Sequence, residues 1–335
     1  MAGTQSIHTS GSGEFTNALE ESHPDNGMAC FDPGDPPSSL PMPALTVRNL
    51  SKSYGSLVAL EGLNLTVEAG QVFGLLGPNG SGKTTLLAVL LDVLHPSGGS
   101  FTWFEGGEGD HVRKRIGALL ETPNFYPYLN ADQNLSIVAS IKRVPEPWDE
   151  LLELVQLSER RRSPYKTYSL GMKQRLALAA CLVGDPDVLI LDEPTNGLDP
   201  EGMVEVRHII QKIAARGKTI ILASHMLDEV EKICSDVAII KKGRLLAVGA
   251  VGSILSDQPT VEAGAADIEM LFQVFSGSPL VRKITRDAGR LILELDPGGN
   301  PAELNRLAFE HGVVLDHLLL KRQSLEAEFL EITRQ

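Results

Sequence analysis

A glycine-rich motif is the part of this sequence whose chemistry is clearest. It fits the pattern G-x-x-x-x-G-K-[ST] at every fixed position, and it lies between a short apolar run at 71–76 and a segment with helical spacing. Its residues, with the threonine that follows them, are Gly77, Pro78, Asn79, Gly80, Ser81, Gly82, Lys83, Thr84 and Thr85. Glycines let backbone N–H groups turn inward around an anion, and a helix N-terminus adds its dipole. The motif therefore predicts a phosphate-binding loop, with Lys83 reaching the β- and γ-phosphates of a nucleotide and Thr84 ligating Mg²⁺.

Two adjacent carboxylates follow a second apolar run. Residues 188–191 are wholly aliphatic, as in a strand buried on both faces, and Asp192 and Glu193 come directly after them. Ligands of open α/β sheets bind beyond the carboxyl ends of the strands, so both carboxylates would reach the phosphate site. We expect Asp192 to hold Mg²⁺ and Glu193 to polarise the attacking water as general base. An apolar run ending in Asp-Glu is common and indicates little by itself. Its position about 110 residues after a phosphate loop makes it a much stronger indication of a nucleotide site.

A phosphate loop also fits a kinase, a GTPase or a helicase, and a third segment distinguishes among these classes. Residues 168–175, with the sequence YSLGMKQR, precede the Asp-Glu strand and open a predicted helix. With the two motifs above, they resemble the ATP-binding-cassette (ABC) ATPases over about 45–249. The signature of that family is usually written LSGGQ; here Leu170 and Met172 replace a glycine and the glutamine, while Ser169 and Gly171 are retained. The resemblance implies that Ser169 and Gly171 of one subunit cap the γ-phosphate bound by another subunit.

Four further positions take a role from the same resemblance. Asp199 ends a segment, 196–199, that resembles the loop crossing the dimer interface, and His225 matches the switch histidine that contacts the γ-phosphate and helps place Glu193. Tyr54 matches the aromatic residue that stacks on adenine. Glu121 stands where most members carry a glutamine that offers an oxygen to Mg²⁺ or water, and relatives resembling bacitracin and lantibiotic exporters often carry glutamate there. Each position also has a simpler interpretation. The 196–199 segment would be a simple turn before a helix, and His225 would be a structural histidine. Tyr54 would be packed into a turn, and Glu121 would be a tolerated exchange.

The pattern of elements predicts an α/β fold with a mainly parallel sheet, because short apolar strands alternate with helical segments. Strands are expected at 45–50, 63–67, 71–76, 116–120, 188–191, 219–223 and 237–240. Helices are expected at 83–94, at 170–183, after Pro200 and up to Ile233. The resemblance adds an antiparallel β subdomain and a helical subdomain to this P-loop nucleotide-binding domain, which we place at 43–250.

Both flanks of this domain differ from it in character. The first 42 residues are rich in Gly, Ser, Pro, Asn and acidic residues, and we expect a disordered acidic tail. After about residue 249, a hairpin at 280–284 and 291–295, a helix at 301–311, a strand at 313–320 and a closing helix at 324–332 predict a small C-terminal α+β domain. We place this accessory domain at 251–335.

The composition of the chain indicates which kinds of partner it binds and in which cellular compartment it is found. The net charge of −13 argues against a nucleic-acid partner, which would require a basic surface. The three cysteines form no CxxC pair and no His/Cys cluster, so they suit reduced cytosolic thiols. No apolar run approaches the roughly 20 residues of a membrane-spanning helix, and no basic start of a secretory signal precedes Arg48. We therefore expect a cytoplasmic protein.

The resemblance completes the functional expectation. It implies an ATP-hydrolysing, Mg²⁺-dependent subunit on the cytoplasmic face of the cell membrane, acting as a homodimer or as a dimer with a related ATPase. The segment 324–333 resembles the ending of ATPases that serve ABC-2-type permeases, which favours export through a separate permease subunit. An import ATPase, an ABC ATPase without a transport role, and a nucleotide-binding scaffold without turnover remain the alternatives.

Overall fold

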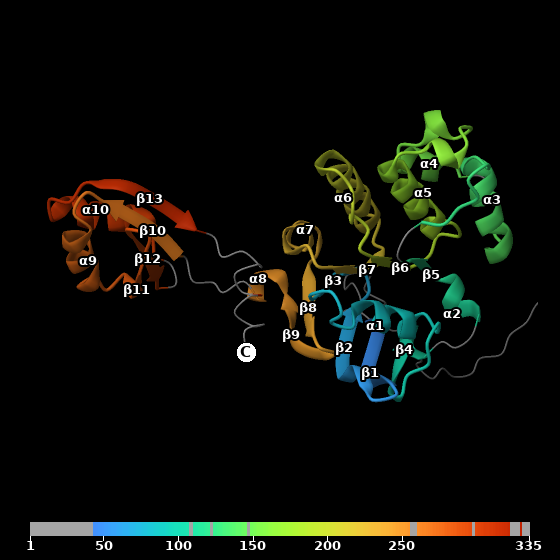
Figure 1. Ribbon diagram of the computed structural model, residues 1–335, viewed down its shortest axis with the longest axis horizontal. Coiled ribbons are helices and arrows are strands. Elements are labelled where there is room, and N and C mark those ends of the chain that lie inside the picture. The colour runs from blue at the N-terminus through green and yellow to red at the C-terminus, as the bar shows by residue number, and fades with distance from the viewer. Residues whose placement is uncertain are drawn as a thin grey trace, which may run out of the picture. The chain divides into compact units, whose positions relative to one another are not determined.

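The computed structural model describes residues 43–106, 110–120, 123–145, 148–254, 260–296, 299–321 and 329 (Figure 1). The predicted disordered tail at 1–42, Glu121 and most of the predicted closing helix at 324–332 lie outside these residues. The domain boundaries placed after residues 42 and 250 stay predictions.

A six-stranded sheet forms the centre of the α/β fold. Its strand order is β5-β6-β7-β3-β8-β9, and every neighbouring pair is parallel except β8 with β9. The strands are, in that order, Ile116–Leu119, Val188–Asp192, Thr219–Ser224, Val72–Leu76, Asp236–Lys241 and Arg244–Ala250. Every residue of β3, β6 and β7 is buried, which is why the sequence shows unbroken apolar runs there. The predicted mainly parallel sheet is confirmed.

The central sheet separates two hydrophobic cores. Successive side chains of a strand point to opposite faces, so in β6 Val188 and Ile190 join one core while Leu189 and Leu191 join the other. The first core lies against helix α1 (Lys83–Leu90) and a three-stranded antiparallel sheet. The second core contains buried residues of helices α5 (Leu170–Leu182), α6 (Pro200–Ala214) and α7 (Leu227–Ile233). This layering fixes the sheet between helices and leaves its carboxyl edge open to ligands.

The antiparallel subdomain has the strand order β2-β1-β4, with β1 at Pro43–Tyr54, β2 at Leu57–Glu68 and β4 at Gly98–Trp103. Both of the first two strands are longer than predicted, because their pairing continues beyond the predicted segments up to Tyr54 and Leu57. Helix α1 is shorter than the predicted 83–94. It ends at Leu90, and Asp92 then adopts a left-handed conformation (φ 58°), which an α-helix does not tolerate.

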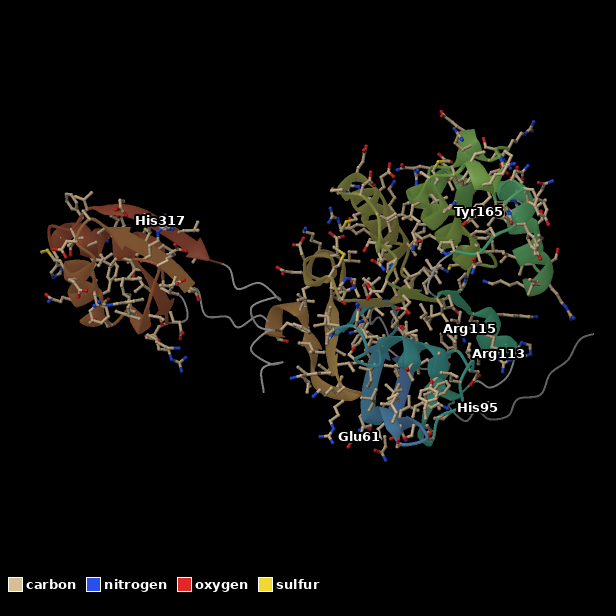
Figure 2. All side chains as sticks on the ribbon, viewed as in Figure 1. Glu61, His95, Arg113, Arg115, Tyr165 and His317 are labelled. Atoms are coloured by element: carbon tan, nitrogen blue, oxygen red, sulfur yellow. The ribbon has the colours of Figure 1, made fainter. Side chains whose placement is uncertain are left out.

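A group of helices makes up the second subdomain and includes two that the sequence analysis missed, α3 (Ala131–Lys142) and α4 (Asp149–Leu154). Figure 1 shows both beside α5. Helix α3 begins with a capping box, in which the Asn130 side chain accepts a hydrogen bond from the Gln133 amide at 2.9 Å and the Gln133 side chain returns one. The Tyr165 ring, labelled in Figure 2, packs edge-on against Phe125 in the same core. The short helix α2 (Asp110–Lys114) precedes β5.

The C-terminal part forms its own α+β unit with its own core. An antiparallel sheet of order β11-β12-β10-β13 packs against helices α9 and α10 around Phe275, Leu293 and Leu304. In chain order its elements are β10 (Thr260–Ala265), α9 (Ile268–Ser276), β11 (Val281–Asp287), β12 (Arg290–Leu295), α10 (Pro301–Glu310) and β13 (Leu315–Lys321). The short helix α8 (Val251–Ile254) comes between β9 and this unit in the chain, and its Val251 belongs to the second core of the central fold. The predicted hairpin and helix are confirmed, whereas β10 and α9 were not predicted.

Two further properties bear on function. None of the described helices has both the length and the apolar character that crossing a bilayer requires. Cys181 and Cys234 are buried free thiols, and burial raises the pKa of each to about 12.

Candidate functional site

The phosphate loop connects the end of β3 to the start of α1, as the motif predicts. Gly82 precedes the helix with φ 110°, a conformation that favours glycine, and a Cβ there would lie 2.7 Å from the Ala59 carbonyl oxygen. At Gly77, a Cβ would lie 2.3 Å from the Ile240 carbonyl oxygen and 2.5 Å from Ser81 Oγ. The loop therefore closes against neighbouring backbone at both glycines, and side chains at these positions would open it.

Lys83 lies beneath this loop and is almost inaccessible, with 6% of its surface exposed. Its ammonium donates a hydrogen bond to the Gly77 carbonyl at 2.7 Å, and it lies 3.6 Å from Glu193 Oε1. Ser81 is also buried, and its hydroxyl has no hydrogen-bond partner among the described residues. A buried hydroxyl and a buried cation beside a glycine loop are suited to bind the oxygens of a phosphate group.

The first residue pair that could hold a divalent cation joins α1 to β6. The Thr84 hydroxyl donates a hydrogen bond to Asp192 Oδ2 at 2.9 Å, and Asp192 is buried at the end of its strand. Hydroxyl and carboxylate oxygens are hard ligands of the kind that Mg²⁺ takes, usually together with substrate phosphates and water. The pair therefore fits a Mg²⁺ ion bound between the protein and a nucleotide.

Glu193 and His225 form a second pair at the same edge of the sheet. His225 follows β7, and its Nδ1 lies 2.9 Å from Glu193 Oε2. Glu193 has a positive φ of 48°, uncommon for a residue with a side chain, while its amide donates to the Ala223 carbonyl at 2.9 Å. Such backbone conformations cluster at functional sites, where the surroundings enforce them. The strained turn after Asp192 presents the Glu193 carboxylate to both Lys83 and His225.

A cavity of about 560 Å³ opens beside these residues, within the range typical of small-molecule sites. Tyr54, half-exposed at 46%, stands in its wall, with the Lys52 ammonium 5.1 Å from the ring centroid. The cavity is lined by Tyr54, Leu57, Val58, Ala59, Asn79, Gly80, Ser81, Gly82, Lys83, Thr84, Thr85, Glu193, Lys242 and Gly243. An aromatic wall at one place and a phosphate loop at another are suited to a nucleotide.

Lys242 and Gly243 are lining residues that the sequence analysis missed. They form the turn between β8 and β9, and the Gly243 amide donates to the Ser81 carbonyl at 2.8 Å. A Lys-Gly pair between two apolar strands indicates a hairpin turn. Sequence spacing contains no signal, however, that this turn packs against a loop at residue 81.

The signature residues lie outside the cavity. Ser169 caps α5, accepting a hydrogen bond from the Met172 amide at 3.2 Å, and a Cβ at Gly171 would meet nothing within 4 Å. Leu170, between them, is 45% exposed. The first turn of α5 is therefore an open surface and contributes nothing to the cavity of its own chain.

The loop at 196–199 lies beside this surface. A Cβ at Gly197 would be 3.5 Å from Leu170 Cδ2, and Asp199 caps α6 by accepting a hydrogen bond from the Gly202 amide at 3.1 Å. The loop thus contacts the signature segment at Gly197, and Asp199, like the signature residues, is not part of the cavity lining. Gly77 and Pro78 belong to the phosphate loop without lining the cavity, and the structure does not describe Glu121.

Comparison with known proteins agrees with this geometry. Residues 60–196 match the family described as ABC transporter. An uncharacterized ABC transporter ATP-binding protein of Bacillus subtilis is 36% identical over 300 residues, covering 87% of this chain and 96% of the relative. The Nod factor export ATP-binding protein I of Cupriavidus pinatubonensis is 35% identical over 329 residues, covering 92% of this chain and 96% of the relative.

Two further similarities extend the comparison to a named transport ATPase and to a solved structure. The bacitracin transport ATP-binding protein of Enterococcus faecalis is 30% identical over 295 residues, covering 86% of this chain and 96% of the relative. The structure of cbiO1 from Clostridium perfringens, part of an ABC transporter complex, has a TM-score of 0.59 and 29% identity, covering 71% of this chain and 96% of that one. The chain therefore belongs to the family of ABC transporter ATP-binding proteins, whose ATP-binding domain hydrolyses ATP.

Proposed function

We propose that this chain is the ATP-hydrolysing subunit of an exporter and that it powers transport through a separate permease subunit. The observation that carries the ATPase mechanism is the convergence of Lys83, Thr84, Asp192, Glu193 and His225 on one edge of the central sheet. Export is supported by the names of similar proteins, a Nod factor export ATP-binding protein and a bacitracin transport ATP-binding protein.

ATP would lie in the cavity with its adenine against Tyr54 and its phosphates over the N-terminus of α1. Lys83 would bind the β- and γ-phosphates, and the buried Ser81 hydroxyl and the loop amides would bind the oxygens that remain. Thr84 and Asp192 would hold Mg²⁺, which offsets negative charge on the phosphates. The half-exposed Tyr54 ring would supply a flat apolar surface for the base.

Glu193 would act as the general base by accepting a proton from the water that attacks the γ-phosphorus. A base must be held within hydrogen-bond reach of that water. His225 would provide this positioning, because Nδ1 lies 2.9 Å from Glu193 Oε2 and would donate to it in the tautomer that carries the Nδ1 hydrogen. The imidazole would also contact the γ-phosphate, so that ATP binding and the orientation of Glu193 would be linked.

A second subunit would complete the site. Ser169 and Gly171 are on an open surface outside the cavity of their own chain, which suits them to cap the γ-phosphate held by another chain. A helix N-terminus with a serine hydroxyl favours an anion there. In this way bound ATP would connect the chain to an identical or related subunit, and hydrolysis of the ATP would remove this connection. Transport requires only that ATP bind the closed dimer more tightly than the open one.

The permease would dock in a groove beside the helical subdomain. A cavity of about 340 Å³ is lined there mainly by apolar residues, among them Phe125, Val138 and Ala180, and Lys142 also lines it. An amphipathic cytoplasmic helix of an ABC-2-type permease would place its apolar face in such a groove. The chain would then lie on the cytoplasmic face of the cell membrane.

ATP turnover by purified wild-type protein and by a Glu193→Gln variant tests the ATPase mechanism. We expect Mg²⁺-dependent turnover that EDTA abolishes. The variant should lose on the order of 10²- to 10⁴-fold in rate, the usual contribution of a positioned general base, while it still binds ATP. It should also accumulate as a dimer in gel filtration with ATP. Wild-type turnover by the variant would reject Glu193 as the base, and a strictly monomeric variant at high ATP would reject the sandwich.

Co-purification with an ABC-2-type permease tests the docking groove. Val138→Glu would place a carboxylate in the groove and should abolish co-purification, leaving basal ATP turnover unchanged. Val204→Glu adds the same charge on α6, at a residue 38% exposed, and serves as the control. If both variants retain the permease equally well, the groove is not its docking site.

A further inference from the structure

A strongly basic cavity lies between the ends of helices α2 and α3. It has a volume of about 350 Å³ and is lined by Arg113, Lys114, Ile141, Lys142 and Arg143. Four of these five side chains are cationic, and none is acidic. In a chain with a net charge of −13, such a local excess of positive charge makes this surface a candidate site for an anion.

The cationic side chains of this cavity differ in how many hydrogen bonds and ion pairs they already make within the protein. The Lys142 ammonium donates to the Val183 carbonyl at 2.8 Å, and burial lowers its pKa. Arg113 makes one exposed ion pair, 3.5 Å from Asp92. Lys114 and Arg143 are exposed and, within the described part of the chain, neither has a carboxylate at ion-pairing distance. Arg113, Lys114 and Arg143 are therefore the cations available to a ligand.

Neighbouring Arg115 belongs to a different environment. Figure 2 labels it beside Arg113, where α2 gives way to β5. Its guanidinium stacks on the Phe104 ring at 3.7 Å from the centroid and pairs with Asp187 at 2.5 Å. These contacts engage its guanidinium, and Arg115 is not among the residues that line the basic cavity.

The apolar member of the cavity indicates what kind of anion it would bind. Ile141 is 77% exposed, and among the described residues no other large apolar side chain is more exposed. A free phosphate ion would gain nothing from an exposed isoleucine beside the cations. A lipid surface would, because cations bind the headgroup phosphates while an apolar side chain enters the boundary between headgroups and acyl chains.

We propose that this basic cavity binds anionic phospholipid headgroups and that Ile141 inserts among them. The proposal rests on the proposed function, because Lys142 lines both this cavity and the permease groove. A subunit docked on its permease through that groove would present the basic cavity on the adjoining surface, towards the bilayer. The rest of this acidic protein is repelled by an anionic bilayer, and the cavity would overcome that repulsion locally, because salt screens charges beyond about 8 Å.

Vesicle co-sedimentation of the full-length protein tests this proposal. Wild-type protein should bind vesicles of phosphatidylcholine with phosphatidylglycerol, and should not bind vesicles of phosphatidylcholine alone. The Arg113→Gln/Lys114→Gln/Arg143→Gln variant should bind the anionic vesicles on the order of 100-fold more weakly, since each cation near such a surface contributes about fivefold. Ile141→Ser should weaken binding by roughly tenfold through the lost apolar contact.

A matched control carries the same change in net charge at exposed cations elsewhere, Lys212→Gln/Arg216→Gln/Arg282→Gln. This control should bind anionic vesicles as wild type does, and all the variants should hydrolyse ATP at the wild-type rate. Vesicle binding by the triple variant at wild-type strength, or no wild-type binding to either vesicle, would overturn the proposal. So would competition by inorganic phosphate at constant ionic strength, which would identify a free-phosphate site. Failure of ATP turnover in wild type would instead count against the proposed function.

Discussion

Thr84 and Asp192 are 108 residues apart in the sequence, and in the fold the Thr84 hydroxyl donates a 2.9 Å hydrogen bond to Asp192 Oδ2. The first residue belongs to the helix that follows the phosphate loop, and the second ends the buried strand β6, which β7 separates from β3 in the sheet. Because parallel strands bring their carboxyl ends to one edge, the two oxygen ligands expected for Mg²⁺ meet at the nucleotide cavity.

Replacing Thr84 with valine should lower Mg²⁺-stimulated ATP turnover. Valine has the shape of threonine without the hydroxyl, so the hydrogen bond to Asp192 and the proposed metal ligand are both lost. A hydrogen bond to a charged group contributes about 1.5–3 kcal/mol, which corresponds to a loss of roughly 10- to 100-fold. A Mg²⁺ titration of ATP turnover measures the effect, and Thr84→Ser should stay close to wild type. Equal turnover by the valine and serine variants would exclude Thr84 as a ligand.

Replacing His225 with alanine should lower the rate of hydrolysis by roughly 100-fold, within the range expected when a proton-transfer group loses its position. The alanine side chain cannot hold Glu193 Oε2, which lies 2.9 Å from His225 Nδ1. ATP affinity, measured by fluorescence of a labelled nucleotide, should change by only a few-fold. His225→Gln offers a hydrogen-bond donor and should recover part of the rate. If glutamine gave no more activity than alanine, the hydrogen bond would not be the important contact.

A methyl group at Gly77 should disrupt the phosphate loop. The added Cβ would lie 2.3 Å from the Ile240 carbonyl oxygen, so the loop or β8 must shift. Gly77→Ala should lose nucleotide binding and about 1–3 kcal/mol of unfolding free energy, as for other overpacked sites. Thermal unfolding and nucleotide titration measure both effects. Gly252→Ala in α8 meets nothing within 4 Å and should be close to neutral. A Gly77→Ala protein as stable as wild type would contradict the close packing.

Two Asp199 variants separate a capping role from an interface role. Asp199 accepts a hydrogen bond from the Gly202 amide, so Asp199→Ala should lower the unfolding free energy by about 1 kcal/mol through loss of the helix cap. Asp199→Asn should restore the cap and hence the stability. If the asparagine variant is stable yet impaired in ATP-dependent dimerisation, the charge also acts between subunits. Stability unchanged in the alanine variant would show that the cap is unimportant.

The two buried thiols should be unreactive at neutral pH. Burial raises the pKa of Cys181 and of Cys234 to about 12, whereas an ordinary cysteine titrates near 8.5. The thiolate is the reactive form, so disulfide-reagent labelling of these two thiols should be far slower than labelling of a free thiol at any pH between 7 and 9. A Cys30→Ser background isolates these two residues, and unfolding in guanidinium should expose both. Rapid labelling of the native protein would show that the core opens readily.

The site residues with local requirements could be recognised from the sequence. A phosphate loop needs glycine at positions where the backbone turns left-handed or meets other backbone, as at Gly82 and Gly77. A strand buried on both faces must be continuously apolar, so the run before Asp192 was visible without a structure. These constraints act within a few residues, and periodicity and residue type report them directly.

Several elements gave too little local signal to be predicted. Helix α4 has six residues, too few for a helical repeat to stand out. Strand β10, with the sequence TVEAGA, contains alanine and glycine where strand propensity favours β-branched residues, and its pairing with β12 and β13 stabilises it instead. The early end of α1 depends on the left-handed Asp92, for which the sequence shows no breaker residue.

The sequence by itself determined the family, the phosphate loop and the chemical types of the groups that act on ATP, because each of these depends on short-range pattern. Only the tertiary structure decided that Lys242 lines the cavity, and only it gave the 2.9 Å distance between His225 Nδ1 and Glu193 Oε2, a pairing that the family resemblance had led us to expect. It also decided that cations from α2 and α3 share one cavity around the exposed Ile141. These relationships join residues that are far apart in the chain. They arise from the pairing of strands and the packing of helices, which no regular residue spacing in the sequence reveals.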